Sequence, residues 1–206
     1  ASRFIYNSCD TFGPMPKIVD PARRRARILD AAFRVVAEEG ATALSFRTVA
    51  RVSGLNVGSV RNTYATARQL LADAAEEAGE RMGRRLAGHD LSGRPGSHDI
   101  DSALAVLAEL LPLDAERRAE NTVLIEFMAA ARTHEVYRAT TERMSRDMRA
   151  VVAAVLTALG ADPAHAEPVT ALMVGLTFEA VTGHGGLTAD EMLRLVRAAL
   201  TTGVDG

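Results

Sequence analysis

Small polar and basic side chains with helix-capping potential gather in the stretch 45–64, SFRTVARVSGLNVGSVRNTY. Ser45 and Asn56 are candidate N-caps, because their side-chain oxygens can accept a hydrogen bond from an unpaired amide in the first helical turn. Gly54 stands between them, where a helix needs a residue that tolerates positive φ at its C-terminus. The stretch therefore predicts two short helices joined by a tight turn. This pattern is typical of a DNA-reading helix-turn-helix, but an αα-corner in an unrelated helical protein would share it.

Side chains suited to contact DNA lie on and around these two helices. Helix N-termini and guanidinium groups bind phosphate, since unpaired amides and a planar cation both match an anion. Gly58 weakens a helix by about 1 kcal/mol relative to Ala, which indicates either close approach of the backbone to DNA or helix packing. Tyr64 is expected to face the small core, with a hydroxyl that can still reach phosphate. The candidate DNA-contacting residues are Arg24, Arg47, Thr48, Asn56, Val57, Gly58, Ser59, Arg61, Asn62, Tyr64 and Arg68.

The distribution of charge supports a role in binding a polyanion at one end only. The formal net charge is −2, yet residues 17–68 hold ten Lys/Arg against four Asp/Glu, while residues 69–206 hold 13 Arg against 21 Asp/Glu. A basic N-terminal quarter joined to an acidic remainder is expected if only the former meets nucleic acid.

No pattern in the sequence indicates catalysis or a metal centre. The five histidines are scattered, with no His-x-x-x-His pair, and the one cysteine has no partner. Gly-x-Ser-x-Gly, phosphate-loop and dinucleotide-binding fingerprints are missing from the sequence. We therefore expect no catalytic residues, no metal and no cofactor.

The elements that must position these residues are predicted to be helices throughout. Hydrophobic residues make up 48% of the chain and aromatic ones 4%, a helical composition with an aliphatic core. The first helix opens at Asp20-Pro21 and ends at Gly40, and a connecting helix runs from Thr66 to about Leu86. No apolar run reaches the roughly 20 residues that span a bilayer, and residues 1–14 lack a signal-peptide pattern. The later elements expected are a helix opening at Asp99 or Asp101, a short helix or turn at 114–119, a central apolar segment at 123–128, and helices at 134–159, 165–181 and 188–200.

The stretch 25–71 resembles the TetR (tetracycline-repressor-like) family of bacterial regulators. The residues that carry the resemblance are Ile28-Leu29-Asp30-Ala31-Ala32 with Phe33, Gly40, Phe46-Arg47-Thr48-Val49-Ala50, Gly54-Leu55-Asn56-Val57-Gly58-Ser59-Val60, Tyr64 and Leu70-Leu71. Two positions depart from the family pattern. Arg61 stands where the family usually has an aromatic residue against phosphate, and Ala65-Thr66-Ala67 replaces the usual Pro-Ser-Lys. Arg61 and Arg68 are candidates to supply the missing phosphate contacts, although Arg61 could instead read a guanine.

The resemblance implies an all-α chain with a three-helix DNA-binding domain at 20–66 and a helical bundle at 67–206 for ligand binding and dimerisation. Residues 1–19 are expected to be either a disordered leader or, in part, residues foreign to the native chain, which could start at Met15. The implied function is that of a cytoplasmic, ligand-responsive homodimer, a repressor released from a palindromic double-stranded DNA operator by a small-molecule effector. Two alternatives stay open: a helical ligand-binding or enzymatic bundle with a structural N-terminal motif, and an architectural DNA-binding protein with a solid C-terminal core.

Two further sets of residues follow from this interpretation. Methionines and aliphatic residues on the C-terminal helices can line an effector pocket, because Met adapts to irregular ligands, although such stripes also form cores. These candidates are Leu107, Leu111, Phe127, Met128, Met144, Met148 and Met173. The helices at 134–159 and 165–181 are candidates for a four-helix dimer interface, unless their stripes are intramolecular core. The interface candidates are Val151, Val155, Ala171, Gly175 and Phe178.

Overall fold

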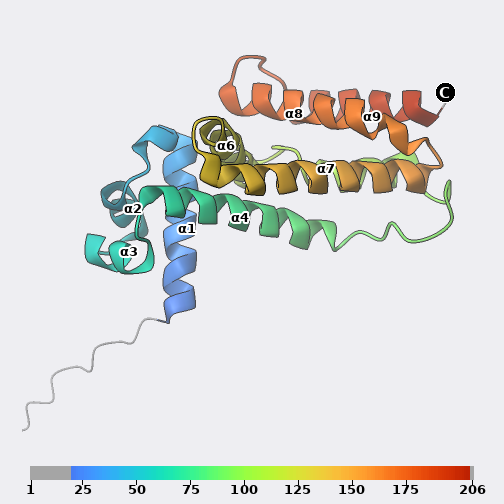
Figure 1. Ribbon diagram of the computed structural model, residues 1–206. Coiled ribbons are helices and arrows are strands. Elements are labelled where there is room, and N and C mark those ends of the chain that lie inside the picture. The colour runs from blue at the N-terminus through green and yellow to red at the C-terminus, as the bar shows by residue number, and fades with distance from the viewer. Residues whose placement is uncertain (1–19, 205–206) are drawn as a thin grey trace, which may run out of the picture.

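The computed structural model describes residues 20–204, so the leader expected at 1–19 lies outside the described residues (Figure 1). In the described range the chain forms nine α-helices and no strand, which confirms the all-α prediction. The helices are α1 (Pro21–Glu39), α2 (Phe46–Ser53), α3 (Val57–Thr63), α4 (Ala67–Leu86), α5 (Ile100–Ala108), α6 (Ala115–Ala131), α7 (Arg138–Leu159), α8 (Ala166–Thr182) and α9 (Ala189–Val204). Single 3-10 turns lie at Ala41–Ala43, Glu135–Tyr137 and Pro163–His165.

Side-chain caps begin the helices where the sequence predicts them. Ser45 and Thr48 form a capping box at α2, in which each side-chain oxygen accepts a hydrogen bond from the other residue's backbone amide. Gly54 ends α2 in the left-handed region, with φ of 68°. The other predicted caps that accept a bond from a first-turn amide are Asp20, Asn56, Thr66 and Asp99. Each cap joins residues two or three positions apart, so the local sequence alone specifies it.

The region around α6 differs from the prediction. The short helix or turn expected at 114–119 is not a separate element, because α6 runs without a break from its Asp114 cap through the apolar segment. The two buried polar residues inside α6 both have partners. Buried Glu120 pairs with Arg85 on α4 (2.8 Å), and the Asn121 side-chain amide donates to a carbonyl one turn earlier.

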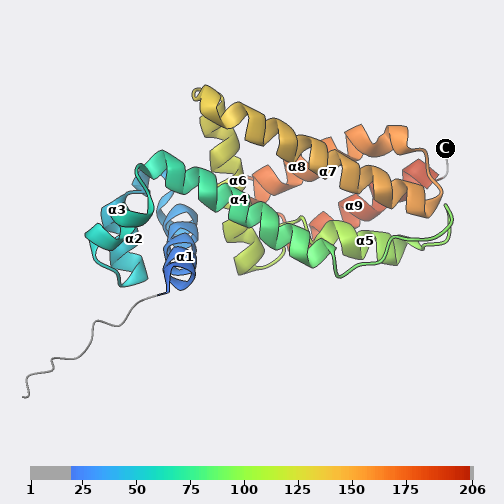
Figure 2. The same cartoon turned by 60° about the horizontal axis from the view of Figure 1, so that its bottom comes forward.

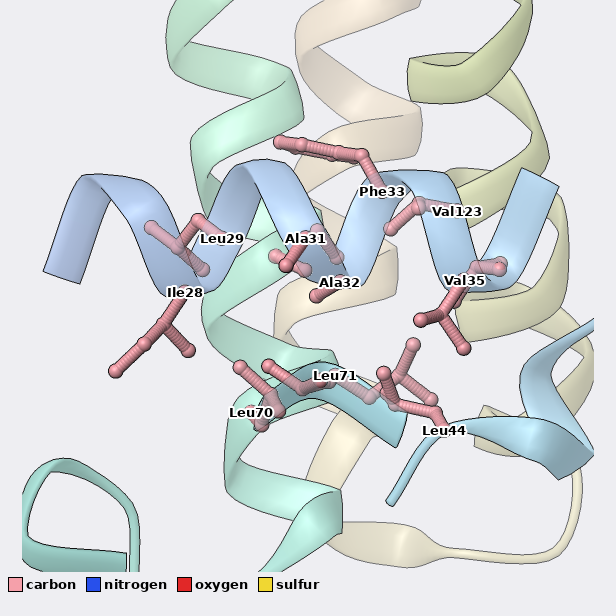
Figure 3. Close-up of a cluster of buried hydrophobic side chains, with 14 of the residues drawn as sticks. Ile28, Leu29, Ala31, Ala32, Phe33, Val35, Leu44, Leu70, Leu71 and Val123 are labelled. Carbon is pink, nitrogen blue, oxygen red and sulfur yellow. The ribbon is translucent and has the colours of Figure 1, made fainter. Parts of the chain in front are cut away.

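The first hydrophobic core joins the N-terminal helices to the middle of the chain. Ile28 and Val35 on α1 point toward the side where Leu70 and Leu71 of α4 lie, whereas Phe33 points to the opposite side (Figure 3). Val123 and Phe127 of α6 and Tyr137 belong to the same core. The helix α1 therefore packs against α6 as well as against α2 and α4.

The second core holds the C-terminal helices together. It contains buried residues of α5, α7, α8 and α9 with Met82 near the end of α4. In Figure 1, α4 and α7 run along one side of this body and α8 and α9 along the opposite side. The helices α1, α2 and α3 lie at one end, and the α4–α5 loop lies at the other (Figures 1 and 2). Within residues 20–204, no helix combines the length and the apolar character that crossing a membrane requires.

Candidate nucleic-acid interface and ligand pocket

The position of α2 is set by α1. Arg27 donates a hydrogen bond from Nη2 to the carbonyl of Ser53 (2.7 Å), and Arg34 donates to the carbonyl of Val52 (3.2 Å). These carbonyls belong to the last turn of α2, where the helix dipole favours a nearby cation. The hydroxyl of Thr48 donates to the carbonyl of Ala43 (2.7 Å) and holds the other end. Both ends of α2 are thus bonded to the rest of the domain, and α3 follows directly from the Gly54 turn.

The arginines of the N-terminal domain fall into two groups. Arg25 pairs with Asp73 (3.2 Å) and Arg51 with Glu39 (2.7 Å), so these two cations are partly neutralised within the protein. By contrast, Arg47, Arg61 and Arg68 are exposed and form no ion pair with any residue in 20–204. An exposed cation without an internal carboxylate partner is available to a phosphate or a guanine edge.

The remaining DNA-contact candidates divide by exposure. Asn56, Gly58 and Asn62 are exposed, and Arg24, Thr48, Val57 and Ser59 are half-buried. A methyl group added at Gly58 would meet only the Asn56 Oδ1 atom, at 3.3 Å, within 4 Å. That oxygen caps α3 by accepting a hydrogen bond from the Ser59 amide, so a methyl group at Gly58 would press on the cap and not on another helix.

Tyr64 lies inside the domain rather than on its surface. It is 2% exposed, and its hydroxyl has no hydrogen-bond partner in the described part of the chain. Burial, followed by the nearby Asp73 carboxylate, raises the pKa of Tyr64 to about 12. Because Tyr64 is buried, its hydroxyl is not exposed at the surface of the domain. Thr48 is similarly occupied, since its hydroxyl bonds within the α2 cap.

A pocket of about 590 Å³ lies between α4, α6, α7 and α8. Met128, Met144 and Met148 line it, together with further aliphatic side chains of these helices. The other four ligand candidates do not line it. Leu107, Leu111, Phe127 and Met173 are fully buried in the two hydrophobic cores. They have the same helical spacing as the pocket residues, so the sequence alone does not separate the two groups.

Polar groups also line this pocket. Glu76 on α4 and Arg143 on α7 form an ion pair, with both carboxylate oxygens 2.5 Å from the Arg143 Nη2 atom. The Thr170 hydroxyl is buried without a hydrogen-bond partner among the described residues. Neither Glu76 nor Arg143 is predicted as a site residue from the sequence, because they lie 67 positions apart and only the fold brings them together.

A second ion-pair network holds the end of α4. Arg85 bonds to Glu120, which is 1% exposed, and lies 3.3 Å from Glu109. Burial lowers the pKa of Arg85, but the hydrogen bond and charge of Glu120 outweigh this effect and raise it. Arg117 and His89 also lie within 3.3 Å of Glu109. The C-terminal end of α4 is therefore anchored to α5 and α6.

The dimer candidates have different environments. Val155 is fully buried in the core of its own chain, whereas Val151 is half-buried and lines the pocket, as Ala171 and Val174 also do. Ala171 and Gly175 on α8 are exposed, and Phe178 is 50% exposed. Val174 on α8 and Leu195 on α9 are also exposed large apolar side chains, at 39% and 43%. Leu195 was not among the predicted residues, because it lies outside the buried stripe of α9.

These features define a class of protein. A basic helix-turn-helix domain is joined by one long helix to a helical body with a pocket, as in a DNA-binding regulator that responds to a ligand. Among residues 20–204, no group of three or more His, Cys, Asp or Glu side chains could hold a metal ion.

Comparison with known proteins agrees with this class. The sequence profile described as "BetI-type transcriptional repressor, C-terminal" matches residues 100–205. The HTH-type transcriptional regulator PksA of Bacillus subtilis (strain 168) is 29% identical over 191 residues, which cover 88% of this chain and 90% of PksA. The chain belongs to the TetR family and has a BetI-type C-terminal part. It is a transcriptional regulator and not an enzyme, as the sequence predicted.

Solved structures show the same fold. A transcriptional regulator from Rhodococcus sp. Rha1 superposes with a TM-score of 0.77 at 24% identity, covering 88% of this chain and 96% of the other. The multidrug binding protein EbrR, solved with ethidium, has a TM-score of 0.63 at 29% identity, covering 87% and 97%. EbrR has also been solved with malachite green, at 27% identity and a TM-score of 0.62, covering 87% and 96%.

Proposed function

We propose that this protein is a homodimeric repressor that binds a near-palindromic operator and leaves it when a small molecule occupies the pocket. The observation that carries the proposal is the position of α4. This helix packs in the core of the helix-turn-helix domain through Leu70 and Leu71, and it also lines the pocket through Glu76 and Met82. A ligand that displaces α4 must therefore act on the DNA-binding domain.

The proposed DNA-binding domain spans residues 20–66, and the effector and dimerisation domain spans 67–206. Within the former, α3 enters the major groove as the recognition helix. Arg47 and Arg68 contact phosphate, while Arg61 and Asn62 contact base edges. Asn56, Gly58 and Ser59 allow the start of α3 to approach the DNA backbone closely. This arrangement is supported by the exposure of Arg47, Arg61, Asn62 and Arg68 and by the lack of ion pairs at the three arginines in the described residues.

A second subunit is proposed to dock on α8 and α9. Phe178 on α8 and Leu195 on α9 expose apolar surface, and Gly175 on α8 allows close helix contact. Ala171 and Val174 on α8 are exposed as well, but they also line the pocket. Both helices lie on the side of the body away from α4 (Figure 1). We thus extend the interface predicted from the sequence to α9 and omit Val151 and Val155. Such a dimer would place two recognition helices on successive major-groove faces, about 34–36 Å apart.

The effector is proposed to contact Met128, Met144 and Met148. A flexible methionine side chain adapts to an irregular apolar surface. The pocket also argues against a purely architectural DNA-binding protein, which would have a filled body. Since ligand and operator act on the same helix, their binding is expected to be reciprocally coupled. We place this activity in the cytoplasm, with the DNA that it regulates.

Selection of bound fragments from a random duplex pool tests this function. The proposal expects an enriched palindrome. Arg61→Ala should cost about 1–3 kcal/mol and relax specificity at one position of each half-site, whereas Arg47→Ala should weaken all sequences alike and lower the salt slope by about one. Arg94→Ala in the α4–α5 loop, at the opposite end of the molecule, is the matched control. Fragments with no shared motif, or equal retention by all three variants, would contradict the assignment of α3.

A further inference from the structure

The polar lining of the pocket carries an excess of negative charge. The ionisable residues that line it are Glu76, Glu80, Asp147 and Glu167 against Arg143 and Arg149. Glu76 is neutralised by Arg143, and Glu80 lies 3.8 Å from Arg84. Asp147 and Glu167 form no ion pair with any residue in 20–204. A pocket with this balance attracts a cation and repels an anion.

The rest of the lining is apolar and deformable. The apolar residues that line the pocket include Leu124 and four methionines: Met82, Met128, Met144 and Met148. Methionine sulfur makes favourable contacts with aromatic rings, and its unbranched chain adapts to a bulky group. The two parts of the lining together suit a molecule with an apolar body and one positive group.

The Glu76–Arg143 ion pair connects α4 directly to α7 across this pocket. In the described range it is the sole ion pair between these two helices. Its side chains are 41% and 50% exposed, and a pair of this exposure contributes little net stability. A ligand cation can therefore compete with Arg143 for the Glu76 carboxylate. The C-terminal end of α4 is held more firmly, by Arg85 with buried Glu120.

We infer that the effector is an amphipathic cation and that its positive group is sensed by displacing Arg143 from Glu76, which releases the middle of α4 from α7. This inference rests on the proposed function, since it names the ligand class and the sensing contact of the proposed effector pocket. It makes Glu76 the residue that recognises the cation and Arg143 an internal competitor for the same carboxylate.

The competition predicts opposite effects at the two partners. The probe is malachite green, a cationic dye, bound to the full chain without DNA. Glu76→Gln should weaken dye binding about fivefold, because the carboxylate is lost. Arg143→Gln should tighten it by a similar factor, because the competitor is lost. Arg143→Lys keeps a cation at this position and should leave the affinity near that of the unchanged protein. Asp101→Asn, which breaks the ion pair between Asp101 and Arg197 outside the pocket, is the control and should change the affinity less than twofold.

A neutral probe separates charge from shape. Leucomalachite green has similar groups without the positive charge and should bind at least tenfold more weakly than the dye. Glu76→Gln should reduce the ratio between the affinities for the charged and the neutral probe, because the carboxylate that recognises the charge is lost. If Glu76→Gln and Arg143→Gln both weaken the dye and both lower the melting temperature, the pair is structural and the inference fails. Equal binding of the charged and neutral probes, or no binding of either, would also overturn it.

The outcome is separable from that of the proposed function. Selection of an operator needs no ligand, so a palindrome can be recovered while the dye variants fail, which would reject the inference alone. Opposite effects of the two variants with no duplex retained would instead reject the proposed repressor and leave the cation site standing.

Discussion

The N-terminal helices (residues 20–66) and the C-terminal helical bundle (residues 67–204) differ in how closely their side chains are packed. In the former, Ile28, Ala31, Ala32 and Val35 of α1 are fully buried against neighbouring helices. In the latter, α4, α6, α7 and α8 leave a pocket of about 590 Å³ along their contact. A close-packed interior transmits displacement, whereas an interior with space can accept a ligand. The close-packed core and the pocket are therefore separate regions of the molecule, and both α4 and α6 contribute residues to each.

Truncation of a core side chain should have the largest effect. Ile28→Ala removes a fully buried side chain from the first core and should cost about 2–5 kcal/mol. Met148→Ala enlarges a space that already exists and should cost less than about 1 kcal/mol while weakening dye binding. Urea unfolding of both variants measures the contrast. Similar losses would mean that the pocket wall is packed as tightly as the DNA-binding domain.

Removal of the Glu120–Arg85 ion pair at the C-terminal end of α4 should have the second-largest effect on stability. Glu120→Ala leaves Arg85 without its buried partner and should destabilise the protein by about 3 kcal/mol. Exposed Glu116 lies one turn earlier on α6, and Glu116→Ala should change stability by less than about 0.5 kcal/mol. Thermal unfolding compares the two. An equal, small change at both positions would show that Glu120 does not anchor α4.

Two glycines contrast a strained position with a permissive one. Gly160 has a φ of 77°, and an added methyl would lie 3.1 Å from the Gly96 Cα, so Gly160→Ala should cost about 1–3 kcal/mol. Gly83, inside α4, has nothing within 4 Å of such a methyl, and Gly83→Ala should stabilise the helix by up to about 1 kcal/mol. Chemical denaturation should therefore give opposite signs, and matching signs would contradict the described geometry at one of the glycines.

Protonation of Glu77 at low pH should have the smallest effect on stability. Burial raises the pKa of Glu77, but hydrogen bonds from Arg81 and Arg84 outweigh it and lower the pKa below 4.5. The stabilisation is therefore present above the unfolded-state pKa and is lost as the pH falls through the folded-state pKa. Glu77→Gln should cost about 1 kcal/mol or less at pH 7 and almost nothing near pH 3. A difference in melting temperature that grows toward low pH would reverse the assigned sign.

The sequence predicts best what depends on near neighbours. Asp20, Ser45 and Asn56 cap helices through bonds spanning two or three residues, and Gly54 ends α2 as expected. Residues 114–119 are different, because they belong to a helix that continues through buried Glu120, whose partner Arg85 lies 35 positions away. Local patterns do not contain that information.

The candidate site shows the same limit. Met144 and Phe127 share helical periodicity, yet Met144 lines the pocket and Phe127 is buried in the first core. The type and spacing of side chains predict which face of a helix is apolar. They do not predict whether that face packs against a neighbouring helix or lines a pocket. The Glu76–Arg143 pair is likewise invisible to spacing rules, since 67 residues separate its members.

The most direct test of the account measures the operator affinity of the full chain as a function of malachite green concentration, with dye binding to bare duplex subtracted. Because both partners act on α4, saturating dye should weaken operator binding at least fivefold, and saturating operator should weaken dye binding by the same factor. Dye that occupies the pocket while the operator affinity stays unchanged would contradict the claim that α4 couples the two sites.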